Sequence, residues 1–477
     1  MPKICKTLAP LGLALALGAC GEGPSTQPAP LDRFTYPTGL ALHTLGDGTR
    51  ALIVVSSNSD LRYDVESGGS VMVVDPEVSS GDALAVRSAF PISSFGGAPA
   101  ILSSRDESAT AAVDPTCAQW PGSDEILVAS RGANALYRLS LADDGTISCA
   151  ADCRTVFGTD LIDTYAVAVA CFDPGTGPVA QAYVTHLGSP NNVGVVSRFD
   201  LLSGSQASTS VQLAPTPTQD VVWDPARRRL YVTTRFATIG IAPMSWIDLA
   251  FPNVVLGTTD LNGFLRGADT RGIALAAPAP GTGFATRAYV AARVFDQDLA
   301  LTFGARTPDV AGALMVLDIT DDATGNPRAR VTRIVPVGIG ASQVHVLPLA
   351  GGRVSGEEIV AVSSDEGSIA LYDATRGTIV RVLATASADT VAPGPFLPID
   401  ITDPRAPESA QRDPAAYRVG EKLFGDKPFA LASEPMADGR IRLYVSSFDR
   451  GFVAEVRIDP AAPAAAQVFK RFGRRQP

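Results

Sequence analysis

Short apolar runs that end in small hydroxyl or basic residues recur along the whole chain. They are rich in Val, Ile, Leu, Ala and Tyr, as expected of buried β-strands. The seven copies are 52–58 (LIVVSSN), 126–131 (ILVASR), 182–186 (AYVTH), 230–235 (LYVTTR), 288–293 (AYVAAR), 359–365 (IVAVSSD) and 443–448 (LYVSSF). Self-similarity at a roughly regular spacing indicates a repeat architecture.

Each of these runs is flanked by apolar segments that complete a four-stranded unit. Most copies are followed by a strand that closes on an aspartate, at 71–75, 245–248, 314–318, 370–373 and 455–459. A further apolar stretch precedes most copies, at 37–42, 165–169, 219–223, 271–275, 343–346 and 428–431. We interpret this stretch as the innermost strand, the repeated run as the second, and the aspartate-terminated run as the third. Variable segments such as 85–90 and 379–383 then form the rim.

Seven such units predict an all-β fold, a seven-bladed β-propeller of four-stranded antiparallel blades. The unit resembles the repeat of YVTN-type β-propellers, within the wider WD40-like and YVTN superfamily, as in 230–235 (LYVTTR) and 443–448 (LYVSSF). The resemblance runs from about Arg33 to the end, so we expect one propeller over 33–477. It implies the architecture and no particular activity, because this fold hosts unrelated functions.

Two irregularities interrupt the repeat. The last blade supplies all four of its strands, ending at 466–472, so we expect 34–36 to pair onto that final strand and close the ring. The segment 384–425 is rich in Pro, Asp and Ala and is expected to be a long insertion before the seventh blade. Loops of that length in compact folds are usually functional or disordered.

The N-terminus has the features of a bacterial lipoprotein signal. Lys3 and Lys6 precede a short apolar run at 8–17, and residues 17–20 (LGAC) resemble a lipobox. The resemblance implies a signal peptide over 1–19, cleavage before Cys20 and acylation of its thiol, with 20–32 as lipidated cysteine and flexible tether. Gly21 in place of an aspartate favours the outer membrane of a Gram-negative bacterium, by analogy with enteric sorting. An ordinary secretory signal is the alternative.

Composition and charge restrict the kinds of partner that we expect. Hydrophobic residues make up 46% of the chain and charged residues 18%, which is typical of a folded domain and excludes disorder. The formal net charge of −10 repels a phosphate backbone, so nucleic acid is not an expected partner. The expected partners are the membrane, through the lipid, and an envelope protein or a small anionic ligand.

Four cysteines remain after the signal, Cys117, Cys149, Cys153 and Cys171. An even number in an exported chain predicts disulfides, and three pairings are open. The predicted blades place all four on one face, between blades 2 and 3. The spacing of Cys149 and Cys153 is not that of a zinc knuckle, so we expect no zinc site.

The ends of the repeated strands supply the candidate ligand site. Five polar residues occupy equivalent positions there, and a sixth stands one position earlier; they are Asn58, Arg131, Arg235, Arg293, Asp365 and, one step earlier, His186. Guanidinium groups around a funnel mouth could hold a carboxylate or another planar anion in bidentate fashion. The alternative is that these side chains cap turns or pair with a neighbouring blade.

His345 is the other candidate, because it stands among small residues of the predicted innermost strands. It is a potential base or metal ligand, or else a hydrogen-bonded filler. No nucleophile elbow, metalloprotease helix or phosphate loop accompanies it. The acidic turns at 143–145 and 318–322 do not match a calcium loop, so we expect neither a metal nor a cofactor.

Two functional hypotheses follow. The first is a non-enzymatic, envelope-anchored binding or protein-interaction scaffold. The second is a propeller enzyme, a lactonase-like hydrolase or an oxidoreductase, acting on a small anionic substrate. Three observations weaken the enzyme hypothesis. The innermost strands are apolar or small, with Asp220 as the acidic exception, whereas propeller lactonases bind calcium through carboxylates and an asparagine there. The chain has three tryptophans in all, whereas propeller quinoproteins carry one in each blade repeat, and it lacks the haem-attachment motif.

Overall fold

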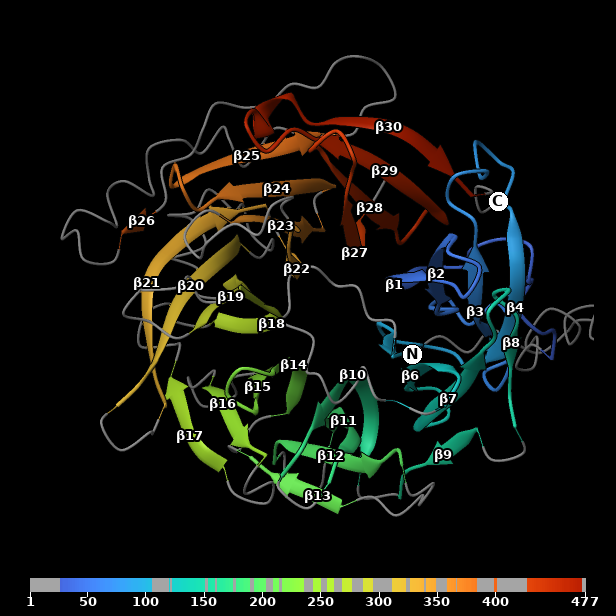
Figure 1. The fold of residues 1–477 in the computed structure, drawn as a ribbon, viewed down its shortest axis with the longest axis horizontal. Helices are drawn as coiled ribbons and strands as arrows, with labels where there is room; N and C mark the ends of the chain where they lie inside the picture. The colour runs from blue at the N-terminus through green and yellow to red at the C-terminus, as the bar shows by residue number, and fades with distance from the viewer. Residues whose placement is uncertain are drawn as a thin grey trace, which may run out of the picture.

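A computed structural model shows seven antiparallel sheets arranged around a central channel (Figure 1), which confirms the predicted seven-bladed propeller. The structure describes residues 26–104, 120, 122–150, 153–158, 161–174, 177–188, 193–202, 209–213, 217–235, 243–249, 255–260, 268–276, 286–294, 311–322, 327–338, 340–348, 358–365, 367–383, 399–400 and 427–473. The predicted signal peptide, Cys20, Cys117 and all of 384–425 except 399–400 lie outside these ranges. In the described part, no helix is both long and apolar enough to cross a membrane.

The innermost strands surround the channel, and the repeated runs form the second strands. The first strands are β1 Pro37–Thr44, β5 Ala100–Leu102, β10 Ile162–Phe172, β14 Thr218–Asp224, β18 Ala268–Ala276, β22 Ala341–Val346 and β27 Pro428–Pro435. The second strands are β2 Arg50–Ser56, β6 Asp124–Ser130, β11 Val179–Gly188, β15 Arg229–Thr234, β19 Thr286–Val294, β23 Ile359–Ser364 and β28 Ile441–Ser447. The apolar residues of these second strands are almost all buried, because neighbouring blades cover both faces.

The third and fourth strands complete each blade. The third strands are β3 Gly69–Val74, β7 Ala135–Leu141, β12 Val195–Asp200, β16 Pro243–Asp248, β20 Ala311–Asp321, β24 Ser368–Asp373 and β29 Phe452–Ile458. The fourth are β4 Val86–Ile92, β13 Thr209–Gln212, β17 Val255–Asp260, β21 Pro327–Val337, β25 Thr378–Leu383 and β30 Gln467–Phe472. Blade 2 divides its rim between β8 Ile147–Ser148 and β9 Arg154–Val156, and in blade 5 β26 Ile399–Asp400 adds to β21.

The hydroxyl residues of the repeated strand join adjacent blades. In blade 4, the Thr233 hydroxyl accepts a hydrogen bond from the Asp220 backbone N–H of its own first strand (3.2 Å). The same hydroxyl donates to the Arg271 carbonyl oxygen of blade 5 (2.7 Å). Thr185, Ser363 and Ser446 make the equivalent pair of bonds in blades 3, 6 and 7. The repeated sequence therefore encodes the contact between blades as well as the strand itself.

The first strands carry a β-bulge at the point where these hydroxyls bond. The pairing register shifts between Thr164 and Val167 in β10, and at the same place in β1, β14, β18, β22 and β27. A bulge interrupts the ladder of backbone hydrogen bonds between the two strands, so the N–H of a bulged residue donates to the hydroxyl side chain instead. The side chains of the bulged residues also depart from the regular alternation between the two faces of the sheet.

The last blade closes on the first without exchanging a strand, since β27 to β30 all come from the C-terminal segment. The expected pairing of 34–36 with the final strand is wrong. The Thr35 carbonyl accepts a hydrogen bond from the Ser57 N–H instead (3.0 Å). Gly81 bonds to the backbone of Arg471 and Gly473, and the fully buried side chains of Phe34 and Phe472 belong to one apolar cluster.

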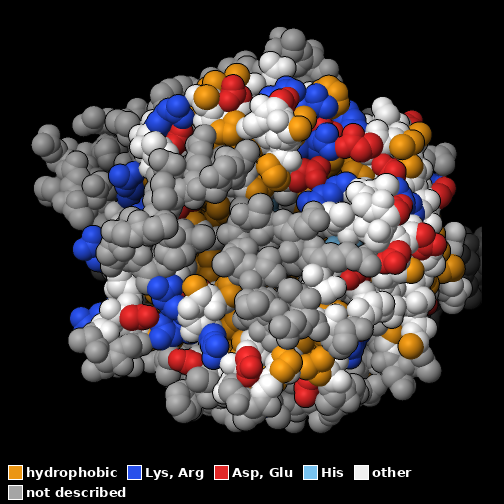
Figure 2. Space-filling view, in the orientation of Figure 1, with side chains coloured by type: hydrophobic (Ala, Val, Ile, Leu, Met, Phe, Trp, Pro, Cys, Tyr) orange, Lys and Arg blue, Asp and Glu red, His pale blue; other side chains and the backbone are white. Residues whose placement is uncertain are grey.

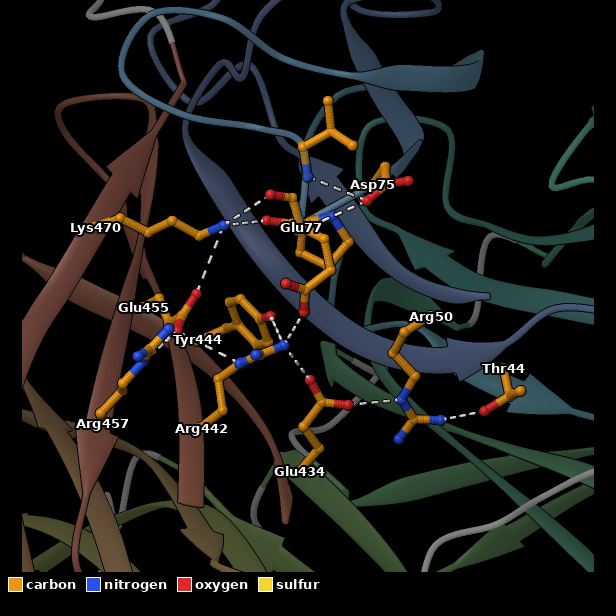
Figure 3. Close-up of polar contacts among 12 residues, drawn as sticks. Thr44, Arg50, Asp75, Glu77, Glu434, Arg442, Tyr444, Glu455, Arg457 and Lys470 are labelled. Atoms are coloured by element: carbon orange, nitrogen blue, oxygen red, sulfur yellow. Dashed lines mark hydrogen bonds and ion pairs between the residues drawn. The ribbon is translucent and has the colours of Figure 1, made fainter. Parts of the chain in front are cut away.

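Charged side chains also join blade 7 to blade 1 (Figure 3). They lie at the other end of the strands from Thr35 and Ser57. We call such a contact between adjacent blades a seam. Glu434 of β27 accepts hydrogen bonds from Arg50 of blade 1 (2.8 Å) and from Arg442 of its own blade (3.1 Å). Arg442 also contacts Glu77, in the β3–β4 loop of blade 1. Glu455, only 1% exposed, lies 3.0 Å from Arg457 and 3.4 Å from Arg442.

The described cysteines are oxidised, as predicted. Cys149 and Cys153 form a disulfide at the rim of blade 2, and Cys171 at the end of β10 is also disulfide-bonded. The first pair links residues four apart in sequence and ties the turn between β8 and β9.

Candidate functional site

A cavity of about 310 Å³ opens where the second strands end and the first strands begin. We call this end of the propeller the funnel face. Arg131, Arg235, Arg293 and Asp365, four of the predicted residues, line the cavity. The described lining also includes Phe95, the small residues of 96–98, Tyr165, Asp220, Arg271, Gln343, Lys427 and Phe429.

Arg131 lies at the end of β6 and reaches the first strand of blade 3. Its Nε is 3.4 Å from Oδ1 of Asp163, and its guanidinium lies 5.8 Å from the centre of the Phe95 ring. Since Arg131 is about one-third exposed, the ion pair leaves part of the guanidinium accessible from the cavity.

Arg235 and Arg271 gather around one carboxylate. Nη2 of Arg271 is 2.5 Å and Nε of Arg235 is 3.9 Å from Oδ2 of Asp269, which is 2% exposed. Burial lowers the pKa of Arg271 to about 10, with Asp269 opposing the shift and Arg235 and Arg293 adding to it. Burial also lowers the pKa of Arg235. Both shifts express the cost of holding cations close together away from water.

Arg293 at the end of β19 bonds across to blade 6. Its Nη2 is 2.9 Å from Oδ2 of Asp365 and 2.5 Å from the Ser342 hydroxyl, and its Nε donates to the Ala341 carbonyl (3.1 Å). The three arginines therefore pair with the next blade, as the alternative interpretation expected, and they also line the cavity.

Asp220 belongs to the bulge of β14 and lines the same cavity. Its carboxylate accepts hydrogen bonds from the N–H groups of Val221 (2.9 Å) and Ile273 (3.0 Å), so it bridges blades 4 and 5. Burial raises the pKa of Asp220 to about 6, against the opposing effect of those two bonds. A carboxyl of this pKa changes charge close to neutral pH.

Asn58 and His186 are absent from the described lining of the cavity. Asn58 is buried with a positive φ of 52° and bonds to Tyr63 of its own loop and to the Ser94 hydroxyl (2.8 Å). His186 is fully buried, with Nε2 2.8 Å from the Ser197 hydroxyl and its ring edge-on to Phe157. Burial lowers the pKa of His186 to about 4, so the ring is neutral at physiological pH.

His345 lies on β22, and its Nε2 is 2.8 Å from the Ser433 hydroxyl of blade 7. Burial lowers its pKa to about 4. It is not among the described residues that line the cavity. No group of three His, Cys, Asp or Glu side chains within the described ranges is arranged to hold a metal ion.

The sequence interpretation missed Arg271 and Asp220 as members of the cavity. Both lie in first-strand bulges, where the side chains of Tyr165, Gln343 and Phe429 also enter the lining. The available signal was positional: each residue is the first or second of a predicted innermost stretch, at 165–169, 219–223, 271–275, 343–346 and 428–431.

Comparisons with known proteins found distant structural similarity and no family. No family model and no curated protein matches the chain. Among solved structures, hydrazine synthase of Kuenenia stuttgartiensis is 12% identical, with 92% of this chain and 98% of that chain covered and a TM-score of 0.45. The Dos1 propeller is 9% identical, with 94% and 80% covered and a TM-score of 0.45. Similarity this low carries no inference about ligand or activity.

Proposed function

We propose that this protein binds a small carboxylate-bearing ligand in the cavity of the funnel face, without chemical conversion. The observation that carries the proposal is the convergence of four arginines from three blades, Arg131, Arg235, Arg271 and Arg293, on one cavity. A guanidinium presents parallel N–H donors that match the two oxygens of a carboxylate.

The charge of the cavity supports an anionic ligand. Its described lining has five basic side chains, the four arginines and Lys427, against two acidic ones, Asp220 and Asp365. The whole chain has a formal charge of −10, so the cavity differs in sign from the protein around it. On the face drawn in Figure 2, by contrast, basic and acidic side chains of the described residues are mixed. A basic cavity in an acidic protein concentrates small anions.

An enzyme that acts on a small anionic substrate is the second candidate, and Asp220 is the observation that favours it. A carboxyl with a pKa of about 6 beside bound substrate has the properties of a general base. Binding remains the better-supported function, because none of the described residues that line the cavity is a histidine or cysteine.

We also propose that the protein is exported and anchored by a lipid on Cys20. Residues 17–20 (LGAC) support this, as does the Cys149–Cys153 disulfide, since disulfides persist in oxidising compartments. A Cys20→Ala variant should leave the membrane fraction. Unchanged membrane fractionation of that variant would contradict the anchoring.

Calorimetric titration with mono- and dicarboxylates tests the ligand class. We expect saturable binding, weakened at least tenfold by Arg271→Ala and by Arg235→Ala. The matched control is Arg440→Ala, because Arg440 is exposed and pairs with Asp438 in a hairpin turn away from the cavity. No binding of any carboxylate, or equal binding by all variants, would refute the proposal. Turnover of a bound carboxylate that Asp220→Asn abolishes would establish the enzyme instead.

A further inference from the structure

The first described residues of the chain lie on the funnel face. The Gln27 carbonyl accepts a hydrogen bond from the Asp64 N–H (2.8 Å), and the Ala29 N–H donates to the Ser67 carbonyl (3.0 Å). Ala29 is buried at 6% exposure. This part of the predicted flexible tether is therefore held against blade 1.

The loop that holds it also contributes to the cavity. Asp64 and Ser67 belong to the connection between β2 and β3, and Ser57 and Ser59 of that connection line the cavity. Farther along the N-terminal segment, Tyr36 packs against Phe448, another lining residue, with ring centres 5.1 Å apart. The chain thus enters the fold beside the mouth of the cavity.

We propose that the funnel face is turned toward the membrane surface. This inference rests on the lipid anchor proposed above for Cys20. Six residue steps separate Cys20 from Thr26, and a fully extended chain covers at most about 3.6 Å per residue. Thr26 therefore lies within about 22 Å of the acylated cysteine.

If the opposite face met the membrane, the tether would have to be longer than this. β1 runs for eight residues from the funnel face to the opposite face, about 26 Å at the usual strand rise. The hairpin turns at 45–49 and 436–440 extend farther still beyond the strands. A chain of about 22 Å that starts on the funnel face cannot pass around the blade and insert its lipid beneath those turns.

Two exposed leucines lie in the segments nearest the anchor. Leu31 of the N-terminal segment is 40% exposed, and Leu61 of the β2–β3 connection is 48% exposed. Apolar side chains that face a bilayer interface gain free energy by entering it. The exposure of Leu31 and Leu61 therefore supports a funnel face that rests on the membrane.

This orientation restricts what can reach the arginines. A gap bounded by a tether of about 22 Å admits small molecules and the head groups of membrane molecules, and excludes a folded domain larger than the gap. The partner of the funnel face is accordingly the bilayer itself. The loops of the opposite face are directed to the aqueous phase.

Energy transfer to labelled lipid tests the orientation. The full chain, purified with its native N-terminus and checked for acylation by mass spectrometry, is reconstituted in phosphatidylethanolamine–phosphatidylglycerol vesicles that carry a head-group acceptor dye. A donor dye is attached at Arg62→Cys on the funnel face or at Asp438→Cys on the opposite face. Both native positions are exposed, at 45% and 46% of the side chain.

We expect higher transfer efficiency from position 62 than from position 438. Equal efficiencies, or the reverse order, in acylated protein would overturn the orientation and leave the anchoring intact. Absence of the lipid would overturn both, and mass spectrometry identifies that case. Circular dichroism of each labelled variant confirms that the fold is unchanged.

Discussion

Arg235 and Arg271 approach the same oxygen, Oδ2 of Asp269, from two adjacent blades. Arg235 ends the second strand of blade 4, and Arg271 lies in the first-strand bulge of blade 5. One buried carboxylate thus stabilises two guanidiniums that also line the cavity. An anionic ligand would supply the further negative charge that this arrangement favours.

Asp269→Asn should destabilise the fold strongly. The substitution keeps the shape of the side chain and leaves two buried guanidiniums without its charge, so we expect the free energy of unfolding to fall by about 3 kcal/mol. Urea denaturation measures it. Asp438→Asn, in an exposed pair with Arg440, is the control and should cost less than about 1 kcal/mol. Equal losses of unfolding free energy in the two variants would show that Asp269 stabilises the fold no more than an exposed aspartate does.

Carboxylate binding should strengthen as the pH falls through about 6. The pKa of Asp220 is raised to about 6, so the side chain is neutral below that pH and negative above it. Arg271, with a pKa of about 10, stays protonated over this range, and burial raises the pKa of Tyr165, so that phenol stays neutral. We expect an affinity change of about tenfold, equivalent to about 1.4 kcal/mol.

Asp220→Asn should abolish that pH dependence, as measured by calorimetry between pH 5 and 8. Folding is linked to the same group. Because the folded-state pKa lies above the unfolded value, stability is greatest below the unfolded pKa and decreases as the pH rises toward 6. A pH profile that is identical in wild type and Asp220→Asn would contradict this role.

Thr233→Val should weaken the contact between blades 4 and 5. The valine keeps the volume and leaves the Asp220 N–H and the Arg271 carbonyl without their hydroxyl partner. We expect a loss of about 1–3 kcal/mol in the free energy of unfolding. Thr49→Val, in an exposed hairpin turn, should change it by less than about 0.5 kcal/mol. Hydrogen exchange would locate the change at this seam.

Glu455→Gln should loosen the seam that closes the ring. Glu455 is 1% exposed and lies between Arg442, Arg457 and Lys470, as Figure 3 shows. Removal of its charge takes a buried carboxylate away from Arg457 and Lys470, while Arg442 keeps Glu434 and Glu77, and we expect a cost of about 3 kcal/mol. Thermal denaturation checks this against Glu66→Gln, whose side chain is 57% exposed. An unchanged melting temperature would assign closure to apolar packing around Phe34 and Phe472 alone.

The blades could be predicted from the sequence because each strand is encoded locally. The repeated runs mark the second strands, and strand order in a propeller follows chain order. Arg131, Arg235 and Arg293 were found for the same reason, since equivalent strand ends meet at one face. Their ion pairs with the next blade depend on tertiary contacts that no local pattern specifies.

The errors in the site have identifiable physical causes. His186 stands one position before the arginines, and successive strand residues point to opposite faces, so its side chain turns into the core. The strand register shows that Asn58 stands one position after the arginines, because Ser56 is equivalent to Thr234, and its left-handed backbone directs a short side chain back to its own loop. Arg271 and Asp220 were missed because a bulge redirects side chains that strict alternation assigns elsewhere.

Blades 2 and 5 carry Ala129 and Ala291 where blades 3, 4, 6 and 7 carry the bridging hydroxyl. At these two seams, Arg131 and Arg293 supply one of the polar links to the next blade. The same side chains face the cavity, so occupancy of the cavity and cohesion of the ring are thermodynamically linked. Ligand binding would then slow the separation of the blades at these two seams before the others. The rate of that separation would show whether the cavity is filled.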